Sequence, residues 1–337
     1  MADNRFPLFR IPFLALSKIV DFYGPHDIIQ LSLCSKRSLR VAKKCWKKKG
    51  LVTANLDVKA IPKINLHFDD TPFYHRFIIL QAIDLQDEET HNIRIGDAVV
   101  PSIHKDTETV TYWQDTIHGI GQIIGYIRDL FDVPITTIYL TVEENQNEIL
   151  NTMDSILSRQ ESVQDCILRS ENSIDDCLTH LLDNCEITGD LIIVGRLSTK
   201  FRHNWNVSLN GLHVSKVLSF TFQNLTNIDC QALDLYSSSL TSKDLNQFLK
   251  HWQNGGSPRI RFASIMINSM DHDIVTSGIE TVPLPQGMSR SYPHMRNSKM
   301  MISVGLDIKR NDGKIGTIHL FENSFGFGVD PIEVFNY

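Results

Sequence analysis

The chain of 337 residues contains 42% hydrophobic, 21% charged and 9% aromatic residues, which indicates an ordinary soluble globular protein with two or three folding units. Its formal net charge of -6 conceals two unlike parts, because residues 1–50 carry 11 Lys and Arg against 3 Asp, whereas the rest carries 22 Lys and Arg against 36 Asp and Glu. No apolar run approaches the ~20 residues of a membrane span, and the N-terminus lacks the order of a signal peptide. We therefore expect neither a membrane-spanning nor a secreted protein.

Six cysteines are spread along the chain without any Cys-x-x-Cys spacing: Cys34, Cys45, Cys166, Cys177, Cys185 and Cys230. Structural zinc sites usually take two of their ligands from such a close pair. We therefore expect reduced thiols that behave as small hydrophobic residues, no zinc site, and a location in the cytoplasm, the nucleus or both.

Apolar residues near the N-terminus recur at helical spacing in three short blocks. The first block opens with Ile11-Pro12, because proline suits the first helical position. Leu16, Ile19 and Val20 then lie on one stripe of a helix. Gly24-Pro25 ends this block and starts the next one.

The second block has apolar residues on both faces of its predicted helix. Ile28 and Leu31 are three residues apart, while Ile29 and Leu33 are four residues apart. Three helices as short as these cannot bury so much apolar surface among themselves. We therefore expect part of this surface to lie against another protein surface.

The third block predicts a helix that is apolar on one side and strongly basic on the other. Ser35 can cap it, and Leu39, Ala42 and Trp46 face inward. The basic side consists of Lys36, Arg37, Arg40, Lys43, Lys44, Lys47, Lys48 and Lys49. A basic stripe can mark nucleic-acid binding or nuclear import, but a solvated helix face is the favoured interpretation here.

At these residues the chain resembles an F-box, the motif that docks substrate receptors onto the small adaptor protein of cullin-RING ubiquitin ligases. Ile11-Pro12 stands where the family has a Leu-Pro pair, residues 25–34 match the second helix, and Cys34-Ser35-Lys36-Arg37 matches a Cys-x-Lys-Arg step. The resemblance implies a set of adaptor contacts: Ile11, Pro12, Leu14, Ile19, Val20, Ile28, Ile29, Leu31 and Cys34. The motifs are most similar to the large nematode family of F-box proteins with an F-box-associated C-terminal domain of type 2.

This resemblance implies an F-box over residues 1–50 and an associated recognition domain over residues 51–337, with a subdivision near residue 110. The sequence pattern supports a domain boundary after Gly50, because the helical spacing of apolar residues gives way to an alternation of apolar and polar residues over 51–80. The alternation predicts strands over 61–68 and 73–80. A polar, acidic turn is expected over 84–91 before an apolar run at 93–100, and residues 104–109 are similarly polar.

Beyond residue 110 helical and strand patterns alternate. Helices are predicted over 117–131, 147–157 and 174–182, and strands over 135–142, 163–168 and 191–194. Predicted strand centres lie near Tyr139, Ile167, Ile192, Leu218, Leu233 and Ile265, and several of the gaps approach the ~20 to 29 residues of leucine-rich repeats. We therefore expect an α/β domain of irregular leucine-rich-repeat-like strand-helix units with adjacent parallel strands.

The sharpest repeat-like stretch is residues 228–267. A short strand is followed by a helix that Thr241 or Ser242 caps and Gly255-Gly256 ends, and a strand over 260–267 follows. Asp312-Gly313 predicts a tight hairpin between strands at 301–308 and 315–321. Residues 269–299 are rich in Ser, Pro, Met and His, so a long loop with at most a short helix is expected. The stretches 228–267 and 307–315 resemble the associated domain of those nematode proteins.

The sequence contains only weak candidates for a catalytic or cofactor site. Gly119 and Gly121 are typical of a phosphate loop, but they and Gly125 lie inside a helical pattern, so close packing by Gly121 and Gly125 is the favoured interpretation. Asp271-His272-Asp273 has no further ligand at metal-site spacing nearby, and His67 with Asp69 and Asp70 is no stronger. We expect no cofactor, no metal and no catalysis by the chain itself.

These observations predict a non-catalytic substrate-recognition subunit of an SCF-type cullin-RING ubiquitin ligase. Its expected partners are the F-box-binding adaptor and a protein target that the sequence does not identify. An F-box-like interaction module without ligase engagement stays open, because no acidic residue follows Pro12 and no aromatic residue follows Arg37. Nucleic-acid binding through the basic third helix is the less favoured alternative.

Overall fold

The computed structural model describes residues 8–46, 52–68, 74–85, 88–142, 146–216 and 220–336. Its contacts divide the chain into two compact units. The first comprises Met1–Ile138 and Asn151–Gln160, and the second comprises Tyr139–Leu150 and Glu161–Tyr337. The division passes through β7 (Ile135–Val142) and α5 (Gln146–Leu157), both of which were predicted from the sequence.

The first unit begins with the three predicted helices, which follow the short 3-10 turn η1 (Leu8–Arg10). They are α1 (Phe13–Val20), α2 (Pro25–Leu33) and α3 (Lys36–Trp46). Pro12 precedes α1 as its N-cap, and the Asp27 carboxylate accepts a hydrogen bond from the Gly24 N–H at 3.0 Å at the start of α2. Ser35 Oγ accepts from the Ser38 N–H at 3.1 Å, so Ser35 caps α3 as expected.

Six strands follow the helices in this unit and pair in the order β1-β2-β3-β6-β5-β4. Of these pairs β3 with β6 is parallel and the others are antiparallel. The elements are β1 (Val52–Val58), β2 (Lys63–Phe68), β3 (Tyr74–Gln81), η2 (Ala82–Asp84), β4 (His91–Ile95), β5 (Ala98–Lys105), β6 (Glu108–Trp113) and α4 (Thr116–Phe131). The apolar run at 93–100 forms two strands because Gly96, with φ +58°, allows a tight turn inside it.

Helices α2 and α3 share one core with the strands and with α4. The rings of Trp46, Phe68 and Phe131 meet edge to face, with centroids 5.0 to 5.8 Å apart. The Tyr126 hydroxyl on α4 forms a short hydrogen bond with Ser32 Oγ on α2. This common core explains why the compact unit extends past residue 50, where the sequence shows its change of pattern.

One glycine of α4, Gly119, allows close packing, and it is not a member of the predicted pair Gly121 and Gly125. A Cβ added at Gly119 would lie 2.7 Å from the Trp113 ring, and one at Gly121 would lie 2.8 Å from the Arg159 guanidinium. A Cβ at Gly125 would meet nothing within 4 Å. Close approach therefore requires glycine at 119, whereas a side chain at 121 would meet the movable end of Arg159. Both positions lie inside a helix rather than in a phosphate-binding turn.

The second unit contains a sheet whose first five strands are parallel, as expected. Their order is β9 (Asp165–Ser173), β11 (Asp190–Arg196), β12 (Ser208–Lys216), β13 (Asp229–Ser238) and β14 (Phe262–Ile267). Antiparallel strands continue it in the order β20 (Ser324–Val329), β19 (Ile315–Phe321), β18 (Leu306–Lys309) and β15 (Val282–Pro283). A separate parallel pair is β8 (Ser162–Val163) with β10 (Glu186–Ile187).

Helices connect several of these strands: α6 (Asp175–Asn184), α7 (Phe222–Asn227), α8 (Ser242–Gln253) and α9 (His272–Thr276). Thr241 caps α8, and its hydroxyl accepts from the Asp244 N–H, which confirms the predicted cap. The strand expected near Leu218 is instead β12, which ends at Lys216, and residues 217–219 lie outside the described part. The parallel strand and helix arrangement is as expected, while a repeating unit stays a prediction.

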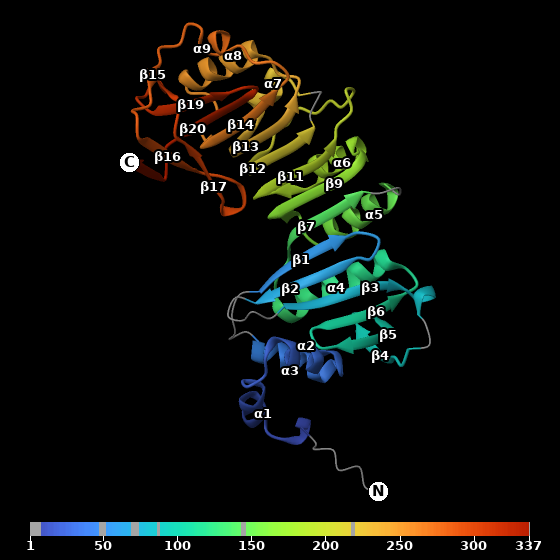
Figure 1. Cartoon of the computed structure of the whole chain (residues 1–337). Coiled ribbons are helices and arrows are strands. Elements are labelled where there is room, and N and C mark those ends of the chain that lie inside the picture. The colour runs from blue at the N-terminus through green and yellow to red at the C-terminus, as the bar shows by residue number, and fades with distance from the viewer. Residues whose placement is uncertain are drawn as a thin grey trace. The chain divides into compact units, whose positions relative to one another are not determined.

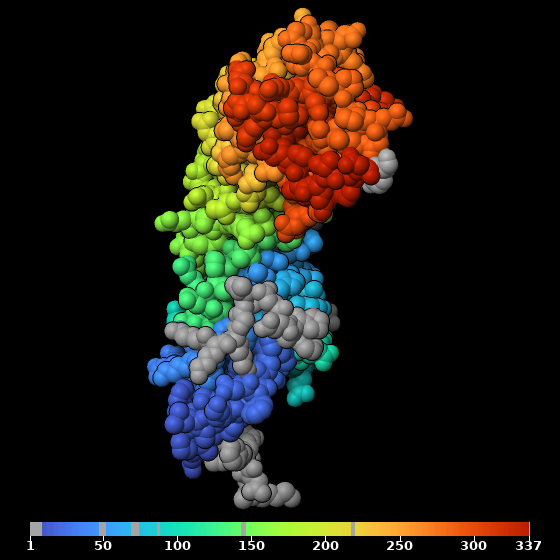
Figure 2. All heavy atoms as spheres, turned by 90° about the vertical axis from the view of Figure 1, so that its left-hand side faces the viewer, coloured from blue at the N-terminus to red at the C-terminus, as the bar shows by residue number. Residues whose placement is uncertain are grey.

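Residues 269–299 do not form the long loop that was predicted. They contain α9, β15, β16 (Met288–Pro293) and η3 (Met295–Asn297), and β17 (Lys299–Ile302) begins at their end. β16 is the central strand of a three-stranded sheet and pairs with β17 and with β21 (Glu333–Asn336). The prediction was wrong because β16 is short and takes one of its two partners from the far C-terminus. In Figure 2 the C-terminal residues, in orange and red, form a broad part of this unit's surface beside residues coloured yellow-green.

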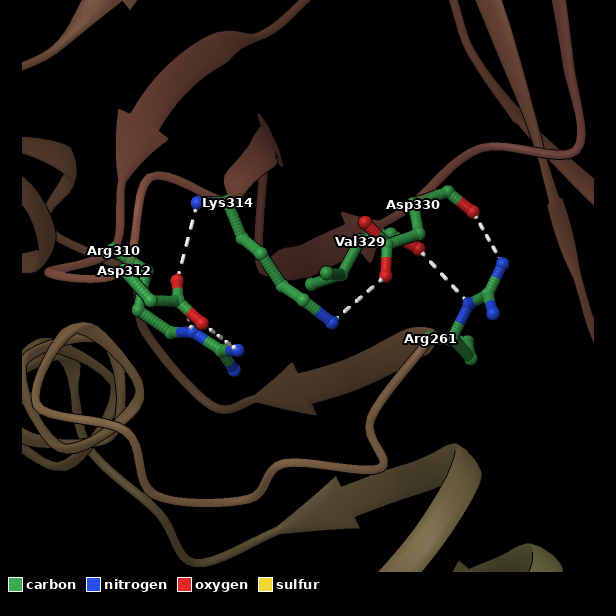
Figure 3. Close-up of polar contacts among 6 residues, drawn as sticks. All are labelled: Arg261, Arg310, Asp312, Lys314, Val329 and Asp330. Carbon is green, nitrogen blue, oxygen red and sulfur yellow. Dashed lines mark hydrogen bonds and ion pairs between the residues drawn. The ribbon is translucent and has the colours of Figure 1, made fainter.

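The predicted hairpin at Asp312-Gly313 is present between β18 and β19, and Gly313 has φ +92°. The Asp312 carboxylate accepts from Arg310 Nε at 2.9 Å and from the Lys314 N–H at 3.1 Å (Figure 3). These hydrogen bonds lower the pKa of Asp312 well below its usual range. Lys314 also pairs with the Asp330 carboxylate at 3.2 Å, and the Arg261 guanidinium donates to the Asp330 carbonyl at 2.6 Å. Side chains thus fix the turn and the end of β20.

Candidate protein-binding surfaces

Helix α1 buries one face and exposes large apolar side chains on the other. Leu16 and Val20 are only 4% and 0% exposed, whereas Phe13 is 48% exposed and Leu14 is 79% exposed. Phe22, just after the helix, is 89% exposed. We call Pro12, Phe13, Leu14 and Phe22 the α1 patch. Several exposed apolar side chains of this size on one short helix and its end are typical of protein-binding surfaces.

The predicted adaptor contacts fall into three groups by exposure. Pro12, Leu14 and Cys34 are exposed, and Ile11, Ile19 and Leu31 are half-buried. Val20, Ile28 and Ile29 are buried in the core of the first unit, so their side chains are not part of its surface. Ile28 and Ile29 are buried because α2 packs inside the first unit, where the Tyr126 hydroxyl of α4 contacts Ser32 Oγ and the Ile29 carbonyl oxygen.

The exposed aromatic residues Phe13 and Phe22 are absent from the predicted set of contacts. Both lie close to the predicted helical stripe in the sequence, but neither lies on the stripe that α1 buries. A large aromatic residue left outside the buried stripe of a short helix was therefore the available signal for this surface.

Basic residues of α3 hold the N-terminal elements in place. The Arg37 guanidinium donates to the Phe9 carbonyl at 2.6 Å, and Lys44 Nζ lies 5.3 Å from the Phe13 ring centroid. Lys43 forms an ion pair with Asp129 of α4. Part of the basic stripe thus has an intramolecular role, while Lys47, Lys48 and Lys49 lie outside the described residues.

Contacts between histidines of separate elements connect α2 to the strands of the first unit. His26 Nδ1 lies 3.1 Å from His75 Nδ1, and Thr109 Oγ1 lies 3.1 Å from His75 Nε2 and 3.0 Å from His104 Nδ1. Burial, followed by the neighbouring histidines, lowers the pKa of His75 to about 3, and similar causes lower the pKa of His104 to about 4. Both imidazoles are neutral at pH 7, as a hydrogen-bonded buried histidine requires.

In the second unit the parallel sheet has one helix-covered face and one partly open face. A Cβ added at Gly195 of β11 would lie 3.4 Å from Ile174 Cδ1. Ile174 directly precedes α6, so Gly195 is on the helix-covered face. Gly211 of β12 is on the opposite face, where an added Cβ would overlap the Met295 side chain. The segment around η3 therefore lies across part of the face that the helices leave free (Figure 1).

Polar contacts attach this segment to the sheet. The Arg296 N–H donates to Asp190 Oδ2 at 2.8 Å, and the Arg296 guanidinium donates to the Tyr139 hydroxyl at 2.9 Å. His294 Nε2 lies 3.0 Å from Asp234 Oδ2. Burial alone would raise the pKa of Asp234, but His213 and His294 outweigh it and lower the pKa. Asp234 is therefore a charged anchor under the segment.

The same region contains a Ser-His-Asp order that we do not assign to catalysis. Ser215 Oγ lies 3.3 Å from His213 Nε2, but His213 Nδ1 and Asp234 Oδ2 are 3.6 Å apart, and this oxygen lies closer to His294. A catalytic triad needs a hydrogen-bonded acid that orients the imidazole. Because the distance from His213 to Asp234 is too long for such a hydrogen bond, we interpret these three residues as a structural polar cluster.

The other candidate sites also have structural explanations. Asp271 caps α9 and accepts from the Ile274 N–H at 3.0 Å, so Asp271-His272-Asp273 is the start of a helix. His67 is exposed, and Asp69 and Asp70 lie outside the described residues. Among the described residues no group of three or more His, Cys, Asp and Glu side chains could hold a metal ion. No helix in the described part is long and apolar enough to span a membrane.

Comparison with known proteins identifies one region of the chain. Residues 200–265 match the family model described as F-box associated, which covers β12, α7, β13, α8 and the first part of β14. This confirms the expected associated domain for that region. Over 335 residues the chain is 19% identical to "Uncharacterized protein F59B2.8" of Caenorhabditis elegans, a match that covers 94% of this chain and 74% of that protein. No solved structure matched.

Proposed function

We propose that this chain is the substrate-recognition subunit of an SCF-type cullin-RING ubiquitin ligase. The F-box-associated match over residues 200–265 supports an F-box protein with a substrate-binding role. In this proposal the N-terminal helices dock onto the adaptor, and the second unit holds the target. The receptor itself needs no catalytic residue, because it acts by raising the effective concentration of the target near the ligase's catalytic parts.

The observation that carries the proposal is the α1 patch. Leu14 and Phe22 expose 79% and 89% of their surface although α1 already buries Leu16 and Val20 against the rest of its unit. Exposed apolar side chains lower the free energy of the protein only when a second surface removes them from water. We therefore propose as adaptor contacts the exposed and half-buried residues of the predicted set, with Phe13 and Phe22 added: Ile11, Pro12, Leu14, Ile19, Leu31 and Cys34.

Three of the contacts implied by the resemblance have a different role in this proposal. Val20, Ile28 and Ile29 form the buried floor on which the patch is built. Changing them would weaken adaptor binding indirectly, through loss of the fold. The proposal also places the chain in the cytoplasm or nucleus, where buried thiols such as Cys166 and Cys230 stay reduced.

Co-purification of the full-length chain with the adaptor tests the proposal, with Leu14→Asp as the informative variant. A buried charge at the centre of the interface should lower the affinity by a factor of 10 or more, since interface anchors contribute roughly 1 to 3 kcal/mol. Ile83→Asp is a matched control, because Ile83 is 86% exposed in η2 of the same unit. The control should bind the adaptor like the wild type.

Two results would change the proposal in different ways. If the wild type binds the adaptor and Leu14→Asp binds equally well, the α1 patch is not the docking face. If the folded wild type does not bind the adaptor at micromolar concentration, the chain is an F-box-like interaction module outside the ligase. Circular dichroism of both variants distinguishes these results from misfolding.

A further inference from the structure

Two cations of α3 lie beside the α1 patch. Lys44 Nζ is 5.3 Å from the centroid of the Phe13 ring, and both residues are exposed. Arg40 precedes Lys44 by one turn of α3, so it lies on the same side of this helix, and it is also exposed. Arg37, which is on this side as well, donates to the Phe9 carbonyl just before α1. This side of α3 therefore faces the start of α1.

Two further cations are close to the patch along the chain. Lys18 follows Leu14 by one turn of α1, so the two side chains lie on the same face, and the Lys18 side chain is 83% exposed. Arg10 is exposed and comes two residues before Pro12. Together the four cations form what we call the basic rim of the α1 patch: Arg10, Lys18, Arg40 and Lys44.

Few carboxylates balance the basic rim. Residues 8–46 contain 7 Lys and Arg but only 2 acidic residues, Asp21 and Asp27. Asp21 Oδ2 lies 3.9 Å from Lys18 Nζ, and Asp27 accepts a backbone hydrogen bond at the start of α2. The other three cations of the rim form no ion pair with a carboxylate in the described part of the chain. The patch is therefore a locally positive region of a chain whose net charge is -6.

We propose that the α1 patch and its basic rim dock on an acidic protein surface, in which carboxylates surround an apolar pocket. The inference rests on the proposed function, because it specifies the chemistry of the adaptor surface that the N-terminal helices bind. Leu14 and Phe22, which are 79% and 89% exposed, enter the pocket and supply most of the affinity. The rim pairs with the surrounding carboxylates and mainly accelerates the encounter.

An acidic protein fits this combination of side chains better than a nucleic acid or a membrane. Phosphates would neutralise the cations, but they would leave the aliphatic Leu14 side chain in water, because sequence-independent binding of nucleic acid is electrostatic. An anionic membrane would repel Asp21, which is exposed and directly precedes Phe22. A protein surface can place its carboxylates opposite the rim, an apolar pocket opposite Leu14, and no acidic group opposite Asp21.

The kinetics of association between the full-length chain and the purified adaptor test the inference. Raising NaCl from about 50 mM to about 500 mM should lower the association rate constant about tenfold or more, because salt screens the rim from the carboxylates. The dissociation rate constant should change by less than about threefold, because the apolar contacts are not screened. Stopped-flow fluorescence measures the fast association, and biolayer interferometry measures the dissociation.

Charge reversal locates the cations that matter. Arg10→Glu/Arg40→Glu should slow association with the adaptor about tenfold and weaken its salt dependence. Lys216→Glu/Lys243→Glu is the matched control, because it changes the net charge equally through two exposed lysines of the second unit, and it should associate like the wild type. Leu14→Ala should instead accelerate dissociation and leave the association rate constant unchanged. Circular dichroism checks that every variant is folded.

The outcomes separate this inference from the proposed function. Adaptor association that is equally fast at both salt concentrations, or equal slowing by the two double variants, would overturn the inference and leave the proposed function standing. No binding of the adaptor by the folded wild type would overturn both. If Arg10→Glu/Arg40→Glu leaves adaptor association unchanged but abolishes binding of a labelled oligothymidine or of phosphatidylserine vesicles, the rim serves that ligand instead. Salt-sensitive self-association in sedimentation velocity that the same variant abolishes would assign the rim to acidic residues of a second copy.

Discussion

Helices α1 and α2 are neighbours in the sequence and both are rich in apolar residues, yet they use these residues in opposite ways. Leu14 of α1 is 79% exposed, whereas Ile28 and Ile29 of α2 are completely buried. Figure 1 shows α2 and α3 beside the strands of the first unit and α1 farther from them. The difference teaches that similar apolar content can produce a core helix and a binding helix within 20 residues.

The contacts of the two helices explain this division. α2 is fixed by apolar burial, by the Ser32–Tyr126 hydrogen bond and by the His26–His75 contact at 3.1 Å. α1 is held mainly through Leu16 and Val20 and through the Lys44 ammonium near the Phe13 ring. α2 thus belongs to the folding core of its unit, and α1 presents a surface on top of it.

The largest effect is expected from deleting apolar atoms in α2. Ile29→Ala should lower the free energy of unfolding by about 2 to 5 kcal/mol, because it removes a completely buried side chain and leaves a cavity. Leu14→Ala in α1 is the control and should change the free energy by less than about 0.5 kcal/mol. Urea unfolding followed by circular dichroism measures both values. Equal destabilisation by the two variants would mean that α1 is as much a core helix as α2.

The histidine contacts of α2 should make the stability of the first unit depend on pH. His75 faces His26 on α2, Thr109 on β6 and the Phe77 ring, and its pKa is lowered to about 3. Since an unfolded histidine has a pKa near 6.5, the unfolded state binds the additional proton between these values. Stability is therefore fully present above about pH 7 and is lost as the pH falls below the unfolded pKa.

At pH 5 this loss should amount to about 2 kcal/mol for His75 alone. The measurement is urea unfolding at pH 7 and at pH 5 for the wild type and for His75→Leu. The variant loses the contacts with His26 and Thr109, but its stability should fall less than that of the wild type between the two pH values. An unaltered difference in His75→Leu would show that this histidine carries no titration of folding.

The helices and their limits could be predicted from the sequence because local chemistry determines them. Pro12, Gly24-Pro25 and Ser35 mark the starts of α1, α2 and α3, and Thr241 marks the start of α8. Strands such as β7 were visible as apolar alternation bounded by polar residues. These signals lie within a few residues of the element that they define.

The orientation of α2 and the existence of β16 could not be predicted, because both depend on distant partners. Ser32 and Tyr126 are 94 positions apart, so nothing near Ser32 in the sequence shows that α4 will contact α2 there. β16 pairs with β21, whose residues Glu333–Asn336 follow it by about 45 positions.

The smallest effect is expected from loosening α1 without substituting a residue of the α1 patch. Lys44→Ala removes the ammonium that lies 5.3 Å from the Phe13 ring centroid, a contact worth about 0.5 to 1 kcal/mol at an exposed site. Amide hydrogen exchange should become faster in α1 while α2 keeps its protection, since α2 has its own buried anchors. Lys36→Ala, at an exposed lysine at the start of the same helix, is the control and should leave both helices unchanged. Parallel loss of protection in α1 and α2 would mean that the two helices unfold as one unit, and that exposure rather than local stability separates the binding helix from the core helix.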